Sequence, residues 1–535
     1  MSLAAPAPLT AAEPSDDITR LMAEAVSWQQ RNDWRRALGL YKQVLALEPQ
    51  HAGALQMMGA MVFGFEQYND AVKLFEMALA ITPDDPQILS NLGAALIPLA
   101  RADEALPYFD LAIALAPAEA QTWNNRSRAL LTLGRAQEAL DSVDQAIALR
   151  PDWPELLAAR ADCLVILRQG EEALAAHDRA IALNPWDPGL YQLKAVTLNR
   201  LDRPHEAIAC CETAHELSPT DGRAMHTKAM LLISMGDFET GWRLFEHRYD
   251  TPTEIGRCRS YPQPVWDGRA PVTGRTVLLY NDAGLGDGLM LARYATEVAA
   301  MGAKVILEVQ PALLPLLRTL PGVHECIPTH SPPPPFDLHC PLFSLPMTMK
   351  TRTDNVPAPQ GYLRSLPERD ALWAQRLGPR SGRRRVGLVW SGLPQNTDDR
   401  NRSLRLERFA QALPLGLDYF SLQATVRPAD QPALAARPWI HDFTGELRDF
   451  ADTASLAAQM DLIVTVDTSV AHLAGGMGLP TWVVLPSPAP YCWMREREDS
   501  PWYASARLWR QGPEREWEPV LARVREGLVE MAALR

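Results

Sequence analysis

The fold and the candidate chemistry both centre on residues 461–476, which read DLIVTVDTSVAHLAGG. The first half is a short apolar run rich in β-branched residues, as in a parallel strand buried on both faces. From Ser469 the apolar spacing becomes helical, so Asp467 and Thr468 lie at a strand-to-helix turn. Such a turn presents unpaired backbone N–H groups and the positive end of the helix dipole to a ligand. The pattern predicts a phosphate site formed by Asp467, Thr468, Ser469 and His472.

A plainer interpretation of the same turn stays open. Asp467 or Thr468 would only cap the helix, and His472 would pack against the sheet. A second turn earlier in the chain favours the binding site. It reads DAGLGDG over 282–288, after a predicted strand. Its glycines, Gly284 and Gly286, let the backbone approach a ligand closely, and Asp287 at the mouth of the next helix could accept a proton.

The glycine turn is not a dinucleotide fingerprint. That motif requires a third glycine at position 289, which is leucine here. The sequence therefore speaks against an NAD or FAD enzyme.

Predicted strands alternate with helices on both sides of these turns. The pattern indicates parallel sheets covered by helices, and we expect two doubly wound, Rossmann-like domains at 272–382 and 383–535. The predicted strands are 275–281, 304–310, 336–342, 386–392, 418–424, 461–467 and 480–486. Because open α/β sheets bind ligands beyond the carboxyl ends of their strands, both turns should border one cleft.

The first half of the chain repeats with a period of 34 residues. Alanines and prolines both recur at intervals of 34 residues. The alanine series is Ala37, Ala71, Ala105, Ala139, Ala173 and Ala207, and the proline series is Pro49, Pro83, Pro117, Pro151, Pro185 and Pro219. A period of this length resembles the tetratricopeptide repeat. We predict seven repeats over 18–250, preceded by a disordered leader at 1–17 and followed by a proline-rich linker at 251–271.

The seventh repeat departs from the pattern, because Gly241 stands where alanine is expected. Terminal repeats are usually atypical, so we expect this one to dock on the next domain. The resemblance to tetratricopeptide repeats implies a concave groove for a protein partner. Its residues would be Gln56, Phe63, Asn124, Arg128, Asp162, Gln192, Asn199 and His226. The alternative is a spacer or an oligomerisation arm.

Composition bounds the function. A net charge of −12 argues against wholesale nucleic-acid binding. Seven cysteines without a Cys-x-x-Cys pair favour a reducing, cytoplasmic compartment, and the leader does not resemble a signal peptide. No apolar run is long enough to cross a bilayer.

Over residues 272–512 the chain resembles the GT-B glycosyltransferases of the heptosyltransferase type, in the subgroup fused to tetratricopeptide repeats. The resemblance rests on GLGD at 284–287, VGLVWSG at 386–392, DRNRS at 399–403, VDTSVAHLAG at 466–475 and REDSPWY at 497–503. It implies a tetratricopeptide superhelix followed by a GT-B fold, which transfers a sugar from a nucleotide-activated donor without a cofactor.

The resemblance also implies roles for residues. Asp287 would be the catalytic base, and the donor would lie against Ser391, Gly392, Arg400, Arg402, Asp467, Thr468, Ser469 and His472. Heptosyltransferases place a lysine after the first strand of the second domain, where this chain offers Arg400 and Arg402. The chain has no Asp-x-Asp, so the divalent-metal site of the other large glycosyltransferase class is not indicated.

Three functions remain open at this stage. The first is transfer of a sugar to serine or threonine of a protein held by the repeats, by analogy with flagellin glycosyltransferases and their nonulosonic acid donors. The second is a non-catalytic scaffold with a vestigial nucleotide-binding domain. The third is a lipopolysaccharide heptosyltransferase, which the polar repeat arm disfavours because a lipid-linked acceptor needs a membrane-facing patch.

Overall fold

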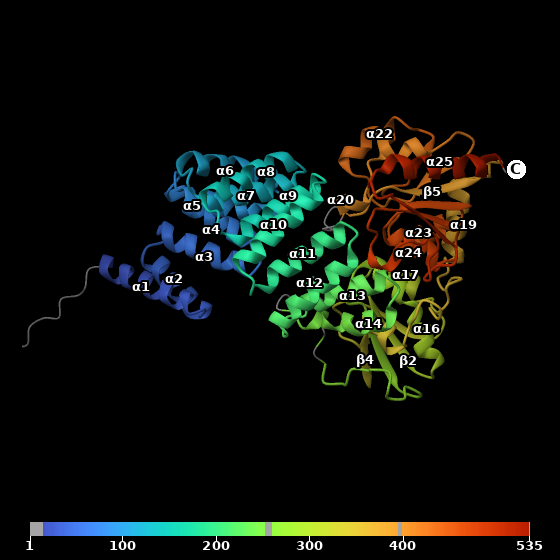
Figure 1. The fold of residues 1–535 in the computed structure, drawn as a ribbon. Helices are drawn as coiled ribbons and strands as arrows, with labels where there is room; N and C mark the ends of the chain where they lie inside the picture. Colours follow the sequence, from blue (N-terminus) through green and yellow to red (C-terminus); the bar gives the residue numbers. More distant parts are fainter. Residues whose placement is uncertain (1–13, 252–258, 260, 394–398, 534–535) are drawn as a thin grey trace, which may run out of the picture. The chain divides into compact units, whose positions relative to one another are not determined.

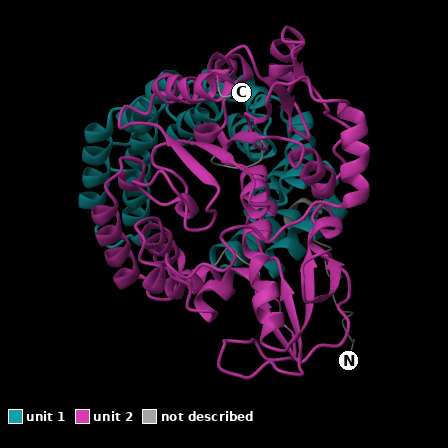
Figure 2. Cartoon of the chain, turned by 90° about the vertical axis from the view of Figure 1, so that its right-hand side faces the viewer, with its two compact units in different colours: residues 1–197 teal, residues 198–535 magenta. Residues whose placement is uncertain are grey.

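The computed structural model describes residues 14–251, 259, 261–393 and 399–533. They divide into two compact units, residues up to 197 and residues from 198 onward (Figure 2). The boundary along the chain falls within the helix Pro188–Arg200. Of the leader predicted at 1–17, residues 1–13 lie outside the described residues, and residues 14–17 belong to the first helix instead. Proline is tolerated in a first helical turn, because its missing N–H has no partner there. Eight residues of the predicted linker, 252–258 and 260, also lie outside the described residues.

The first half of the described chain is an all-helical tetratricopeptide superhelix (Figure 1). Each 34-residue repeat has two helices. The helices of residues 14–183 each pack on the next helix along the chain, and so do those of residues 204–245. The helices are α1 (Pro14–Gln30), α2 (Trp34–Leu47), α3 (Ala52–Gly64), α4 (Tyr68–Ile81), α5 (Pro86–Leu96), α6 (Ala102–Leu115), α7 (Ala120–Thr132), α8 (Ala136–Leu149), α9 (Pro154–Ile166), α10 (Gly170–Leu183), α11 (Pro188–Arg200), α12 (Pro204–Leu217), α13 (Arg223–Ser234) and α14 (Phe238–Phe245).

The period of 34 follows from how each pair packs. The repeated alanines lie in the second helix of each pair and are fully buried, and the repeated prolines stand two residues beyond the end of that helix. Small residues are also required between the helices: a Cβ on Gly93 would lie 2.7 Å from the ring of Phe109. Gly241 has a similar reason, since a Cβ there would lie 2.5 Å from Cγ1 of Ile233. The seventh pair, α13 and α14, is therefore packed too closely for alanine.

The second half of the described chain contains two parallel sheets. The first has the order β3-β2-β1-β4 and the second β10-β9-β8-β5-β6-β7. The strands are β1 (Thr276–Tyr280), β2 (Lys304–Val309), β3 (Val323–Pro328), β4 (Leu338–Pro341), β5 (Arg385–Val389), β6 (Asp418–Ser421), β7 (Ile440–His441), β8 (Leu462–Val466), β9 (Thr481–Leu485) and β10 (Ala506–Arg510). This is the predicted α/β architecture.

Helices follow most of the strands. They are α15 (Leu285–Leu291), α16 (Arg293–Ala300), α17 (Leu314–Leu317), α18 (Leu345–Thr348), α19 (Pro367–Leu377), α20 (Asp399–Arg402), α21 (Leu406–Phe409), α22 (Gln431–Ala435), α23 (Phe450–Ala457), α24 (Ser469–Gly476) and α25 (Trp517–Ala533). Short 3-10 helices are η1 (Ile97–Leu99), which lies in the repeats, η2 (Glu246–Tyr249), η3 (Leu342–Ser344), η4 (Ala410–Ala412), η5 (Pro428–Asp430) and η6 (Tyr491–Trp493). Among the described residues no helix is both long and apolar enough to cross a membrane.

One apolar core joins the last helical pair to both sheets. It contains Ile233 of α13, Trp242 of α14, Leu279 of β1 and Val483 of β9. Trp242 and Phe238 also contact the ring of Trp502, at centroid distances of 6.2 and 5.7 Å. The expected docking of the seventh repeat is therefore present, and this pair is part of the second compact unit.

Candidate functional site

The turn after β8 opens directly into helix α24. Thr468 is the N-cap residue, with an extended backbone, and the helix begins at Ser469. The Thr468 side chain does not cap the helix; its hydroxyl pairs with that of Thr465 at 3.2 Å. The plainer interpretation of this residue as a helix cap therefore does not describe its side chain. The first amide groups of an eight-residue helix are left for other partners.

Asp467 is buried and held by two donors. Trp493 Nε1 donates to its Oδ1 at 2.7 Å, and Arg402 Nη1 lies 3.4 Å from its Oδ2. Its side chain is 8% exposed, and that of Arg402 is 15% exposed. The carboxylate is thus fixed by an indole and a guanidinium, and it also faces His472 and Cys492.

His472 lies on the first turn of α24 with its ring fixed on two sides. Its Nδ1 shares a hydrogen bond of 2.9 Å with the Tyr503 hydroxyl, and its ring stacks on Trp493 at a centroid distance of 5.1 Å. Burial lowers the pKa of His472 to about 4, although Asp467 acts in the opposite direction. The imidazole is therefore neutral at pH 7 and can donate or accept a hydrogen bond without carrying charge.

The glycine turn after β1 packs against the turn after β8. A Cβ on Gly286 would lie 2.9 Å from His472 Cδ2 and 3.5 Å from Ser469 Cα. Glycine is needed at this position because any side chain would collide with the histidine. The two turns singled out in the sequence, about 190 residues apart, are therefore in direct contact.

Asp287 sits at the start of α15, on the same turn. Its Oδ2 accepts the backbone N–H of Gly284, the N-cap residue, at 3.2 Å. Desolvation raises the pKa of this carboxyl to about 6, opposed by the Gly284 bond and increased by the negative charges of Asp467 and Asp282. At pH 7 the group is mostly ionised, yet it is far more basic than an ordinary aspartate, which suits a proton acceptor.

The residues predicted after β5 divide into two groups. Ser391 is buried, where its amide donates to Gln423 Oε1 at 3.1 Å, and the Gly392 amide donates to Ser403 Oγ at 2.9 Å. Arg402 points to Asp467, whereas Arg400 is exposed on α20. Arg402 is thus joined to the turn after β8.

Three aromatic side chains and one thiol complete the site, and no role was predicted for them. Tyr491, Cys492 and Trp493 form η6, after β9, and Tyr503 precedes β10. Among the described residues the buried Tyr491 hydroxyl has no hydrogen-bond partner. Burial raises the pKa of Tyr491 well above its usual value, and the negative charges of Asp287 and Asp467 raise it further. Tyr503 stood in the motif REDSPWY, which was the only signal for this group.

A buried network ties the end of the repeats to the glycine turn. Tyr249 donates its hydroxyl to Asp282 Oδ2 at 2.9 Å, and Arg248 Nη2 lies 3.4 Å from the same oxygen. Arg248 also pairs with Glu246 at 2.6 Å and donates to Ser344 Oγ at 2.9 Å. Its side chain is 3% exposed. The first residue of the glycine turn is thus positioned by η2.

The predicted groove residues all lie on the first helix of a pair. They are Gln56 and Phe63 on α3, Asn124 and Arg128 on α7, Asp162 on α9, Gln192 and Asn199 on α11, and His226 on α13. The last two fall in the second compact unit and are engaged within it. Asn199 accepts a hydrogen bond from Arg495, and the ring of His226 packs on Phe245 at 4.7 Å. Burial lowers the pKa of His226 to about 4.

The repeats belong to a known class. Residues 29–96, 91–154 and 124–188 each match family models of the tetratricopeptide repeat. Protein FlbA of Caulobacter vibrioides is 25% identical over 331 residues, which cover 57% of this chain and 55% of FlbA. The chain thus spans about half the length of this curated relative.

Solved structures of tetratricopeptide-repeat proteins match part of this chain. A thermophilic tetratricopeptide-repeat protein of Thermus thermophilus is 24% identical, with a TM-score of 0.33, and the match covers 34% of this chain and 99% of that protein. A repeat protein of Parabacteroides merdae is 15% identical, with a TM-score of 0.39, and the match covers 44% of this chain and 94% of that protein.

Proposed function

We propose that the second compact unit is a GT-B glycosyltransferase, which transfers a sugar from a nucleotide-activated donor to a protein held by the repeats. The observation that carries the proposal is the contact between the glycine turn and the turn after β8, where Gly286 meets His472. Two strand-end turns that face each other bring a carboxylate and a helix N-terminus to one place. Ligands of open α/β sheets bind at such edges.

On the donor side, the nucleotide phosphates bind the N-terminus of α24, at Thr468 and Ser469. Backbone N–H groups and the helix dipole favour an anion there. Arg402, fixed beside Asp467, stabilises the charge on the departing phosphate oxygens. His472 is neutral at pH 7, so it contributes a hydrogen bond to the phosphate and not a charge.

On the acceptor side, Asp287 takes the proton from a serine or threonine hydroxyl of the protein acceptor. The hydroxyl oxygen then attacks the anomeric carbon of the sugar, and the bond between that carbon and the phosphate oxygen breaks. A carboxyl with a pKa of about 6 is ionised at pH 7 and still basic enough to share this proton.

The repeat arm recruits the acceptor. A superhelix offers many weak polar contacts to an extended polypeptide, and its last pair packs into the core that supports both sheets. With the resemblance to flagellin glycosyltransferases, this supports flagellin or a similar exported protein as the acceptor and a nonulosonic acid as the sugar, in the cytoplasm before export.

A panel of nucleotides and nucleotide sugars in a thermal-shift assay tests the donor class, because a ligand that binds the folded state raises the unfolding temperature. His472→Ala should weaken binding of the best ligand in calorimetry without loss of fold. Unchanged affinity would remove His472 from the site, and no shift with any nucleotide would oppose the proposed function.

A further inference from the structure

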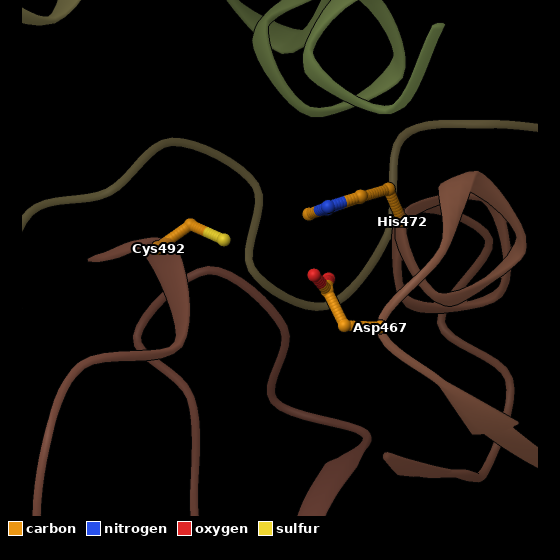
Figure 3. A group of neighbouring side chains, drawn as sticks. All are labelled: Asp467, His472 and Cys492. Atoms are coloured by element: carbon orange, nitrogen blue, oxygen red, sulfur yellow. The ribbon is translucent and has the colours of Figure 1, made fainter. Parts of the chain in front are cut away.

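Three buried side chains converge beside the turn after β8 (Figure 3). Asp467, His472 and Cys492 point toward one another, and their ligand atoms all lie within 4.8 Å of one another. They come from the end of β8, the first turn of α24 and η6 after β9. As whole residues, Asp467, His472 and Cys492 are 5, 6 and 7% exposed. Three polar side chains on separate elements thus share one small buried space.

The donor atoms are chemically matched to one class of ion. A carboxylate oxygen, an imidazole nitrogen and a thiolate sulfur form a set that suits zinc, whereas calcium and magnesium prefer oxygen alone. Three protein ligands with one position open for another ligand is the pattern of catalytic zinc sites. We propose that Asp467, His472 and Cys492 bind a single Zn²⁺ ion. This site goes beyond the proposed function and does not depend on it.

The surroundings hold these side chains in place for metal binding. The Tyr503 hydroxyl engages Nδ1 of His472, which leaves Nε2 as the ligand nitrogen, and the stacked Trp493 ring holds the imidazole plane. The Trp493 indole also donates to Asp467 Oδ1 at 2.7 Å. Outer hydrogen bonds of this kind orient the ligands of protein metal sites.

The local charges define what the open position accepts. When the ion binds, the Cys492 thiol releases its proton to solvent and the thiolate bonds to the metal. The Asp467 carboxylate and the thiolate then cancel the two charges of Zn²⁺, while the positive charge of Arg402, 3.4 Å from Asp467, offsets the negative charge of nearby Asp287. The open position of a zinc ion in such neutral surroundings accepts an oxygen ligand, such as water or a phosphate oxygen. With the ion bound, His472 would act on a phosphate through the metal.

Cobalt is the probe for this site, because a thiolate bonded to Co²⁺ gives a charge-transfer band in the near ultraviolet. We expect the full-length protein, stripped with a chelator, to bind one equivalent of Co²⁺ with this band, and Zn²⁺ to displace it. Cys492→Ser should abolish the band, while Cys326→Ser, which alters another cysteine of the same unit, should leave it unchanged. Trp493→Phe keeps the stacked ring but removes the indole N–H, and should weaken metal binding about 10- to 100-fold.

A measurement on the unaltered protein covers the case in which Cys492→Ser does not fold. X-ray absorption at the zinc edge, with one equivalent of Zn²⁺, should give one sulfur at about 2.3 Å and nitrogen or oxygen ligands at about 2.0–2.2 Å. A shell without sulfur, or a cobalt band that survives in Cys492→Ser, would overturn the site. Failure of the stripped protein to bind Zn²⁺ or Co²⁺ at micromolar concentration would do the same. Nucleotide binding by the metal-free protein would leave the proposed function standing while the metal site fails.

Discussion

Replacing Asp287, the proposed base, with asparagine should make the protein more stable at pH 8. The folded-state pKa of Asp287 is about 6, against 3.8 for the carboxyl in the unfolded chain. Between pH 3.8 and about pH 6 the folded state therefore binds more protons than the unfolded state. The free energy of unfolding therefore falls as the pH rises through this window, and the loss is complete above the folded-state pKa.

A difference of about two pKa units corresponds to about 3 kcal/mol at pH 8. Asparagine carries no charge to desolvate, so it avoids this cost. The asparagine side chain accepts a weaker hydrogen bond from the Gly284 amide than a carboxylate does, which reduces the gain in stability by about 1 kcal/mol. We expect Asp287→Asn to exceed the parent protein in free energy of unfolding by about 2 kcal/mol at pH 8, and to match it within about 1 kcal/mol at pH 4.

Urea unfolding followed by tryptophan fluorescence, at several pH values between 4 and 8, measures the difference between the two proteins. Other titrating groups, such as His472, act on both proteins and cancel in the difference. A difference that does not change with pH, or an asparagine variant less stable at pH 8, would refute the argument that Asp287 is a desolvated base. If Asp287 is the base, the same variant should lose about a hundredfold or more in transfer rate while it retains donor binding.

Three further results are expected from the same structure. The transfer rate should rise with pH up to about 6 and then level off, as Asp287 ionises, and a profile without an inflection near pH 6 would point to another base. Gly93→Ala should cost about 1–3 kcal/mol, because its Cβ would overlap the ring opposite, while Gly39→Ala, with nothing within 4 Å, should be neutral or stabilising in thermal unfolding. Arg248→Met should cost about 3–5 kcal/mol, because it removes the cation beside the buried Asp282 carboxylate and the partly exposed Glu246 carboxylate. Arg376→Met breaks an exposed ion pair and should cost far less; equal losses would show that the buried network contributes no more than a surface pair.

The repeats could be predicted almost completely from sequence. Their helices pack mainly on neighbours in the chain, so Ala37 and its successors at intervals of 34 report the packing directly. The parallel sheets were also predictable, because buried strands such as 462–466 are continuous apolar runs. Strands β3, β7 and β10 were missed. β3 has only one buried residue and β7 has only two residues in all, so neither gives the continuous apolar signal of a buried strand.

Only part of the candidate site could be predicted from the sequence. The two turns carry local signals, namely glycines near Asp287 and the strand-to-helix change at Asp467. Cys492 and Trp493 carry none, because their loop reaches Asp467 only after β9 has been placed beside β8 in the sheet. The pairing of Arg248 with Asp282 likewise depends on docking of the last repeat. Side-chain pairs made by tertiary packing leave no spacing in the sequence.

The burial of α13 and α14 in the core shared by both sheets determines which repeats can be gained or lost during evolution without loss of the fold. Losing or duplicating a 34-residue segment among the earlier repeats would leave Trp242, Arg248 and the glycine turn untouched. The same event at the last pair would remove side chains that support both sheets. Under the proposed function, new acceptor preferences should therefore arise by gain, loss or exchange of the earlier repeats, while the last pair stays constant in length.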